Sequence, residues 1–210
     1  MLMEESLNMS LSAVLQIMQH RLMTESTYFG VKALKSPTDF WVYQEIIYAH
    51  RPEVIVEIGN AFGGSTLALA HMCDLADHGE VVGIDISHTN IHDKVKQHPR
   101  IRLLEGDACQ LFSSIQRICD GKRVLVIEDS SHTYENTLSV LKLYSQLTQL
   151  GDYLIVEDSI CHHGLEVGPA PGPFEAIEVF VKENGSFEVD RSKESFLITW
   201  NPKGYLKKVR

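Results

Sequence analysis

Residues 54–65 read Val54-Ile-Val-Glu57-Ile-Gly59-Asn-Ala-Phe-Gly63-Gly-Ser65, and this stretch decides the fold of the 210-residue chain. A short apolar run, typical of a strand covered on both faces, ends in a glycine-containing loop and leads into a helix. Glycines at such a turn let the backbone approach a ligand closely, just before a helix N-terminus. The displaced second glycine distinguishes the loop from the dinucleotide pattern G-x-G-x-x-G.

Strand and helix alternate on the C-terminal side of this loop. Strands are predicted at 81–84, 101–104, 124–127 and 153–156, and helices at 66–73, 109–119, 133–147 and 174–183. Repeated βαβ units predict an α/β fold with a doubly wound, mostly parallel sheet and helices on both faces. Residues 187–189 and 196–199 are expected to form an antiparallel hairpin at one edge of this sheet.

An amphipathic helix is predicted before the loop at 24–36, and a second helix from Pro37 to about His50. Residues 1–26 are therefore assigned to an N-terminal helix and residues 27–210 to the main domain. Two interpretations of the N-terminal helix stay open: it packs on its own domain, or it covers a site or joins a second subunit in a homo-oligomer. Its apolar stripe consists of Leu7, Leu11, Val14, Leu15, Met18 and Leu22.

The composition limits the classes of partner. With 19 basic and 28 acidic residues the formal net charge is −9, which argues against binding to nucleic acid or anionic membranes. No apolar run approaches the roughly 18 residues of a membrane span, and the N-terminus is acidic where a secretory signal is basic. Four dispersed cysteines without a CxxC motif indicate reduced thiols. We expect a cytoplasmic protein.

Acidic residues end the second and third predicted strands, where doubly wound sheets bind ligands. Asp85 follows Gly59 by 26 residues, near the spacing at which an acid accepts the hydroxyls of a ribose. Asp107 could accept the exocyclic amine of an adenine. The alternative is that each acid only caps the following helix. The candidate nucleoside-cofactor site consists of Glu57, Gly59, Gly63, Ser65, Asp85 and Asp107.

The fourth and fifth predicted strands end alike, in Glu128-Asp129-Ser130 and Glu157-Asp158-Ser159. Carboxylates gathered on adjacent strands repel one another unless a cation compensates them. Oxygen ligands and open positions suit Mg²⁺, so Asp129, Glu157 and Asp158 are the candidate ligands. Alternation points Glu128 away from this site. The alternative is that Glu128 and Glu157 cap helices or pair with Lys or Arg.

Histidines lie close to these acids in the sequence. His132 follows Asp129 by three residues at a strand-to-helix turn, and is the candidate general base. Asp129 is the second candidate catalytic residue. His162 and His163 are weaker candidates for contact with a substrate.

These motifs carry a family resemblance that runs from about residue 27 to the end of the chain. The E-x-G-x-x-x-G-G-S pattern resembles the nucleoside-binding loop of S-adenosylmethionine-dependent methyltransferases. Over the range from about residue 27 onward, the chain resembles the cephalosporin hydroxylase/macrocin-type sugar O-methyltransferase family. The first matching stretches are Tyr28-Phe-Gly-Val, Lys35-Ser-Pro37-Thr-Asp39-Phe, Tyr43-Gln-Glu45, Val56-Glu57-Ile-Gly59 and Gly63-Gly64-Ser65. The others are Asp129-Ser-Ser-His132-Thr133, Glu157-Asp158, Gly172-Pro-Phe-Glu-Ala-Ile177, Phe187-Glu-Val-Asp190-Arg191 and Asn201-Pro-Lys-Gly204-Tyr205-Leu206.

The resemblance implies a Rossmann-like methyltransferase fold that uses S-adenosylmethionine and Mg²⁺, and its metal-binding carboxylates align with Asp129, Glu157 and Asp158. The expected reaction is methyl transfer to a hydroxyl of a small secondary metabolite or sugar, with His132 as proton acceptor. Acceptor specificity is expected in the loops at 24–36 and 160–173. Two alternatives stay open: another enzyme on the same fold, such as a β-lactam hydroxylase or an NAD(P)-dependent oxidoreductase, and a non-catalytic nucleoside-binding subunit.

Overall fold

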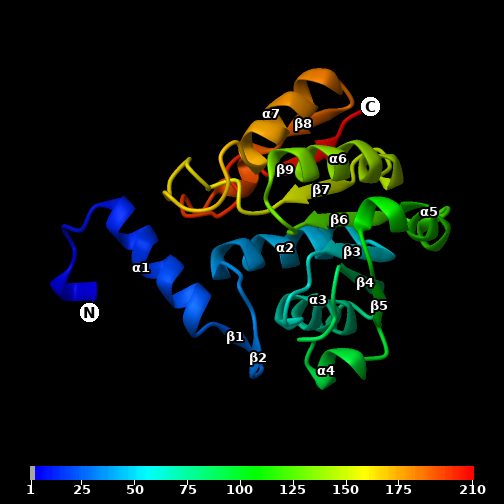
Figure 1. Ribbon diagram of the computed structural model, residues 1–210, viewed down its shortest axis with the longest axis horizontal. Helices are drawn as coiled ribbons and strands as arrows, with labels where there is room; N and C mark the ends of the chain where they lie inside the picture. The colour runs from blue at the N-terminus through cyan, green and yellow to red at the C-terminus, as the bar shows by residue number, and fades with distance from the viewer. Residues whose placement is uncertain (1–2) are drawn as a thin grey trace.

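A seven-stranded sheet forms the centre of the structure, a computed structural model that describes residues 3–210 (Figure 1). The strand order is β5-β4-β3-β6-β7-β9-β8. Strands β3 to β7 run parallel to one another, and β9 pairs antiparallel with both β7 and β8. The strands are β3 (Val54–Ile58), β4 (Glu80–Asp85), β5 (Ile101–Glu105), β6 (Val124–Glu128), β7 (Tyr153–Val156), β8 (Phe187–Val189) and β9 (Tyr205–Lys208). The predicted doubly wound α/β fold is confirmed.

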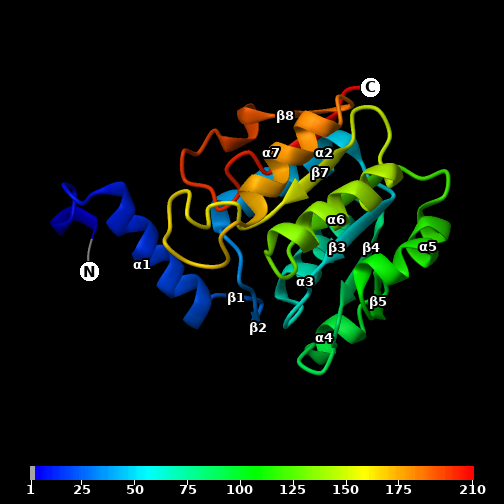
Figure 2. The ribbon, with the colours of Figure 1, turned by 45° about the horizontal axis from the view of Figure 1, so that its top comes forward.

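Helices cover both faces of this sheet (Figure 2). Apolar side chains of α5, α6 and α7 pack on one face, and those of α2 and α3 on the other. The helices are α1 (Leu11–Thr24), α2 (Pro37–His50), α3 (Gly64–Leu75), α4 (Asp93–Lys96), α5 (Ala108–Cys119), α6 (Tyr134–Tyr144) and α7 (Pro173–Glu183). Short 3₁₀ turns are η1 (Met3–Glu5), η2 (Ser145–Leu147) and η3 (Arg191–Glu194).

The central strands β3, β6 and β7 are buried along their whole length, which explains their continuous apolar runs. The chain moves outward from β3 to β5 on one side and from β6 onward on the other. The order of strands therefore reverses between β3 and β6. Such a switch point opens a crevice at the carboxyl ends of the two strands, and ligands of open α/β sheets bind there.

The C-terminal hairpin differs from the prediction in one strand. β8 pairs with β9 and not with residues 196–199, which form no strand. The cause is burial: Tyr205 and Leu206 are fully buried, whereas Leu197 is 79% exposed. β9 also pairs with β7, so it lies inside the sheet and β8 forms the edge.

Two small elements were not predicted from the sequence. A short hairpin joins β1 (Thr27–Tyr28) to β2 (Val31–Lys32) within the 24–36 segment. The four-residue helix α4 precedes β5. Both are too short to leave a periodic pattern in the sequence.

Helix α1 lies to one side of the sheet in both views (Figures 1 and 2). Its Leu15 and Leu22 are buried against Ile160, Leu165 and Trp200, so the C-terminal part of the predicted stripe packs within its own chain. The first two residues of the predicted stripe are open to solvent: Leu7, which precedes α1, and Leu11, at which α1 begins. Between residues 3 and 210 no helix combines the length and apolarity that crossing a membrane requires.

Candidate active site

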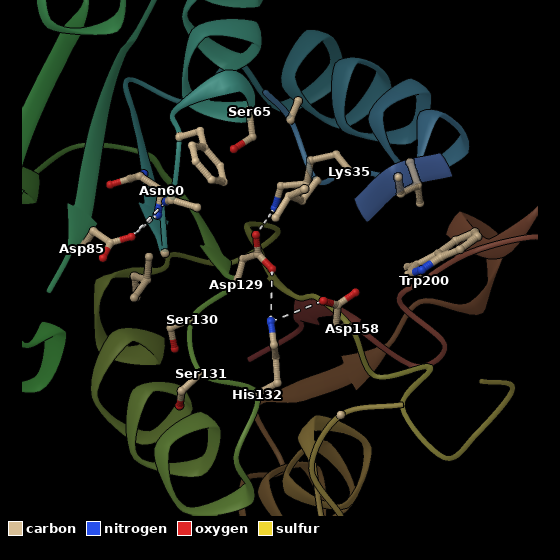
Figure 3. Close-up of a pocket in the computed structure, with 18 of the residues that line it drawn as sticks. Lys35, Asn60, Ser65, Asp85, Asp129, Ser130, Ser131, His132, Asp158 and Trp200 are labelled. Atoms are coloured by element: carbon tan, nitrogen blue, oxygen red, sulfur yellow. Dashed lines mark hydrogen bonds and ion pairs between the residues drawn. The ribbon is translucent and has the colours of Figure 1, made fainter. Parts of the chain in front are cut away.

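A pocket of about 820 Å³ lies at the carboxyl ends of the parallel strands, at the switch point of the sheet (Figure 3). Its wall comes from the loops after β3, β4, β5, β6 and β7, from the segment between β2 and α2, and from α1. The sequence motifs at these strand ends are therefore brought to one cavity.

Close backbone packing explains two glycines in the β3–α3 loop. Gly59 has a φ of +91°, and a Cβ there would overlap the carbonyl oxygen of Asp129 at the end of β6. A Cβ on Gly64 would overlap the carbonyl oxygen of Lys32. Both glycines and Ser65 line the pocket. At these two glycines the loop presents bare backbone to the cavity.

Gly63 lies elsewhere than expected from the sequence. Its φ is +84°, and a Cβ there would collide with Val95 of α4 and lie close to Ile91. It does not belong to the pocket wall. Gly63 therefore permits α3 to begin and α4 to pack closely, and any effect on a ligand is indirect.

Asp85 and Glu57 support the loop from two sides. Oδ2 of Asp85 accepts the backbone N–H groups of Asn60 at 2.8 Å and Ala61 at 2.9 Å, and Asp85 lines the pocket. The buried Glu57 carboxylate accepts from the Thr66 hydroxyl and the Asn60 amide, behind the loop and outside the pocket wall. The structure therefore places Asp85 where a ligand can reach it and gives Glu57 a supporting position.

Asp107 caps α5, which is the alternative that the sequence left open, and it also lines the pocket. Its Oδ1 accepts the backbone N–H of Gln110 at 3.0 Å, which caps α5. The same residue lines the pocket beside Gly106 and Ala108. Capping fixes the carboxylate at the rim without removing it from the cavity.

Asp129, His132 and Asp158 form a cluster in the pocket (Figure 3). Nε2 of His132 lies 3.3 Å from Oδ2 of Asp158 and 3.9 Å from Oδ1 of Asp129. One ligand atom from each of the three residues lies within 4.8 Å of the others. His132 and Asp158 have positive φ values of 56° and 55°. Asp and His adopt the left-handed region more readily than most other residues, and here it turns both side chains into the cluster.

Glu157 is near this cluster but contacts a partner that the sequence did not reveal. The amino group of Lys35 forms ion pairs with both Asp129 and Glu157, and all three side chains are largely buried. Burial raises the pKa of Asp129 to about 8, although the charge of Lys35 acts in the opposite direction. Burial and the charge of Asp129 raise the pKa of Glu157 well above its usual value. Glu157 does not belong to the pocket wall, and the alternative that it pairs with a lysine is realised here.

Three other candidates lie outside the pocket wall. Glu128 is buried and accepts from the Ser130 hydroxyl at 2.6 Å, in keeping with its predicted orientation away from the site. His162 bonds to Glu166, and His163 bonds to Glu175 and stacks on Phe174. The structure does not place these two histidines where they could contact a substrate in the pocket.

The far end of the pocket is mostly apolar and was not anticipated residue by residue. Trp200 donates its indole N–H to the Gln19 side chain at 2.7 Å, which ties α1 to the segment before β9. No local pattern marks these residues, because they come from three separate parts of the chain. This end is lined by Gln19, His20, Leu22, Met23, Ile160, Cys161, Val167 and Trp200.

Solved structures with the same fold include two forms of CmcI. The chain superposes on the "CmcI-N160 apo-structure" with a TM-score of 0.69 and 23% identity, covering 88% of this chain and 76% of that one. It superposes on "cmcI-D160 Mg-SAM" with a TM-score of 0.67 and 22% identity, covering 88% and 77%. An O-methyltransferase from Bacillus cereus in complex with SAH gives 0.58 and 18%, covering 85% and 80%.

Sequence relatives are closer. The family model "Rhamnosyl O-methyltransferase/CmcI" matches residues 20–209. The rhamnosyl O-methyltransferase of Mycobacterium leprae is 37% identical over 191 residues, which cover 86% of this chain and 82% of the relative. That of Mycobacterium tuberculosis H37Rv is 34% identical over 192 residues, covering 87% and 78%. The resemblance recognised in the sequence is confirmed: the chain belongs to the rhamnosyl O-methyltransferase/CmcI family.

Proposed function

We propose that the protein transfers the methyl group of S-adenosylmethionine to a hydroxyl group of a sugar or secondary-metabolite acceptor, with the help of Mg²⁺. One observation carries the proposal: a single pocket joins the glycine loop of a nucleoside cofactor to the cluster of Asp129, His132 and Asp158. Two similarities support it, to relatives named rhamnosyl O-methyltransferases and to a solved structure named for Mg and SAM.

The glycine loop fits the methyl donor. Gly59 and Gly64 bring the main chain to the cavity surface, and Asp85 and Asp107 supply carboxylates at the next two strand ends. These acids would accept hydrogen bonds from the ribose and adenine of the donor. The donor provides the electrophilic methyl group, and the protein provides its position relative to the acceptor oxygen.

The acidic cluster fits a divalent metal. Asp129, Glu157 and Asp158 carry three negative charges when ionised, and their neighbour Lys35 carries one positive charge. The remaining charge of −2 matches one Mg²⁺, and carboxylate oxygens are the ligands that this ion prefers. Bound there, Mg²⁺ would supply a Lewis acid that lowers the pKa of the acceptor hydroxyl.

His132 is placed to take the proton of that hydroxyl. Its Nε2 faces the pocket between Asp129 and Asp158, and the side chain is one-quarter exposed. The Asp158 carboxylate at 3.3 Å would stabilise the imidazolium that forms. His132 would therefore act as general base, as predicted from its position three residues after Asp129.

The far end of the pocket would hold the remainder of the acceptor. α1, the 160–168 loop and Trp200 line it, in keeping with the predicted importance of the 160–173 loop for specificity. Self-association and a cytoplasmic location, both expected from the sequence, stay predictions.

The test is a methylation screen with labelled S-adenosylmethionine against rhamnosides and other polyhydroxylated acceptors, with Mg²⁺ or with EDTA. We expect labelled product only with Mg²⁺. Calorimetry with S-adenosylhomocysteine and with NAD⁺ serves as the control for the cofactor. Binding of NAD⁺ in the absence of any binding of S-adenosylhomocysteine would overturn the proposal.

A further inference from the structure

Lys35 is a buried lysine that takes no part in the proposed transfer of the methyl group or of the proton. Its side chain is 4% exposed, and its amino group contacts the carboxylates of Asp129 at the end of β6 and Glu157 at the end of β7. The residue also lines the pocket. A lysine is almost never buried without a specific charge partner, so this position requires an explanation.

We propose that the Lys35 ammonium group is a permanent counter-charge to the carboxylates of Asp129, Glu157 and Asp158. It holds Asp129 and Glu157 in place without a metal, and it limits the affinity of the site for a metal. This inference rests on the proposed function, because it concerns the metal site of that reaction. It assigns Lys35 a positioning role, since it acts through the two carboxylates.

The hydrogen bonds around Asp129 support this role. Lys35 contacts Oδ2 of Asp129, while Oδ1 is the oxygen that faces His132. The lysine thus occupies one side of the carboxylate and leaves the other side directed to the pocket. The contact with Lys35 therefore orients the Asp129 carboxylate so that one oxygen stays directed to the pocket.

The local fold holds Lys35 rigidly in this position. Ser36 and Pro37 follow it at the start of α2, and Asp39 in the first turn accepts from the backbone N–H of Trp200 at 2.9 Å and the Tyr205 hydroxyl at 2.7 Å. The N-terminus of α2 is therefore bonded to the segment that leads into β9. Lys35 lies one residue before this fixed turn.

The charge balance gives the direction of the effect. When all three carboxylates are ionised, as metal binding requires, their net charge together with Lys35 is −2, and without Lys35 it is −3. A cation a few ångströms from the metal position repels a divalent ion strongly where water is largely excluded. Removing the lysine should therefore tighten metal binding and destabilise the metal-free protein, in which the carboxylates would repel one another.

The experiment compares wild type with Lys35→Met and with a matched control, Lys32→Met. Lys32 lines the same pocket, but its amino group lies over the Phe62 ring, 4.7 Å from its centroid, and outside the carboxylate cluster. Calorimetric titration with Mn²⁺ and with Mg²⁺ at pH 8 should show at least about tenfold tighter binding to Lys35→Met. Lys32→Met should stay within about threefold of wild type, because water screens its charge.

Thermal unfolding gives a second readout. Lys35→Met should unfold at a lower temperature than wild type in EDTA, and excess Mg²⁺ should close most of this gap. If Lys35→Met does not fold, Glu157→Gln and the double variant Lys35→Met/Glu157→Gln replace the pair. The double variant should then bind Mn²⁺ at least about tenfold more tightly than Glu157→Gln.

Equal or weaker Mn²⁺ binding after removal of the lysine, in whichever background folds, overturns the inference. Titration with S-adenosylhomocysteine in EDTA separates this failure from failure of the proposed function. A wild type that binds S-adenosylhomocysteine while Lys35→Met shows unchanged metal affinity refutes the role of Lys35 alone. A wild type that binds neither S-adenosylhomocysteine nor Mn²⁺ refutes the proposed function itself.

Discussion

Two clusters of histidine and aspartate contain similar residues, but one lines the pocket and the other lies outside its wall. Asp129, His132 and Asp158 meet in the pocket, and His71, Asp74 and His98 meet on the outer side of α3. In each cluster one ligand atom per residue lies within 4.8 Å of the others. By proximity alone both clusters are candidate metal sites.

The outer cluster is satisfied by its own chain. Asp74 accepts from Arg100 Nε at 2.7 Å, and it lies 3.0 Å from Nε2 of His98. Nδ1 of His98 accepts the Arg100 backbone N–H at 3.2 Å, so in the neutral ring Nε2 carries the proton and has no lone pair for a metal. His71 bonds to Tyr28 at 3.2 Å. These contacts connect α3 to the turn that precedes β5, so the outer cluster has a structural role.

The pocket cluster differs from the outer cluster in its charge balance and in its backbone conformation. Its acids outnumber the cations they contact, and its His132 and Asp158 adopt left-handed backbone. Unbalanced charge that faces a cavity therefore distinguishes the pocket cluster from the outer one, and the residue types that lie close together do not.

The largest expected difference between the clusters concerns their histidines. His132→Ala should lower turnover roughly 10²–10⁴-fold, the range for loss of a general base. The loss should shrink as the pH rises, because more of the acceptor hydroxyl then ionises without help. His98→Ala should leave turnover unchanged and lower only the melting temperature. Rates at two pH values test this, and a His132→Ala enzyme as active as wild type would show that the metal alone activates the hydroxyl.

The aspartates should differ next. Asp158→Asn keeps the shape of the side chain but removes one negative charge, so activity at ordinary Mg²⁺ should fall about 10²-fold or more and recover partly at higher Mg²⁺. Asp74→Asn should leave the Mg²⁺ dependence unchanged and cost at most about 1 kcal/mol of stability, since its ion pairs are partly exposed. Curves of rate against Mg²⁺ measure both. Identical curves for Asp158→Asn and wild type would remove the metal from the mechanism.

Two glycines extend the comparison to the backbone. A Cβ at Gly59 would overlap Asp129, whereas a Cβ at Gly30, also at positive φ, would meet no atom within 4 Å beyond its chain neighbours. Gly59→Ala should weaken binding of S-adenosylhomocysteine more than tenfold and cost roughly 1–3 kcal/mol of stability. Gly30→Ala should cost only about 1 kcal/mol and leave binding unchanged. Calorimetry in EDTA measures both affinities, since the donor should bind without metal. Equal affinities for the two variants would place the donor away from this loop.

The sequence predicted most of the fold because the decisive signals are local. The runs Val124–Ile127 and Tyr153–Val156 are apolar throughout and are buried on both faces. The prediction of the last strand was wrong because β9 contains two lysines, Lys207 and Lys208, and so lacks an apolar run. The segment 196–199 is more apolar in sequence but remains partly open to solvent. Lys208 pairs with Phe187 of β8, and its amino group donates to the carbonyl oxygen of Thr148 at 2.8 Å, a contact that no local pattern predicts.

The site divides in the same way. Asp129, His132 and Asp158 could be proposed from the sequence, because the ends of adjacent parallel strands must meet. Lys35 could not, since it lies 94 residues before Asp129 and reaches it only through the tertiary fold. Gly63 was assigned to the donor because spacing alone does not tell which glycine faces the cavity and which faces α4.

The apolar stripe that runs from Leu7 into α1 has an inner and an outer part, and the outer part gives the smallest expected effect on stability. Leu15→Ala should cost about 2–3 kcal/mol, because Leu15 is buried against Ile160 and Trp200. Leu7→Ser with Leu11→Ser should change stability by less than about 0.5 kcal/mol, since these side chains are 71% and 47% exposed. If the predicted homo-oligomer uses this exposed part, the double variant should still have a lower molar mass by light scattering. An oligomer of unchanged mass would mean that α1 serves only its own chain, as a wall of the pocket. A wild type that is already monomeric would end the prediction of self-association.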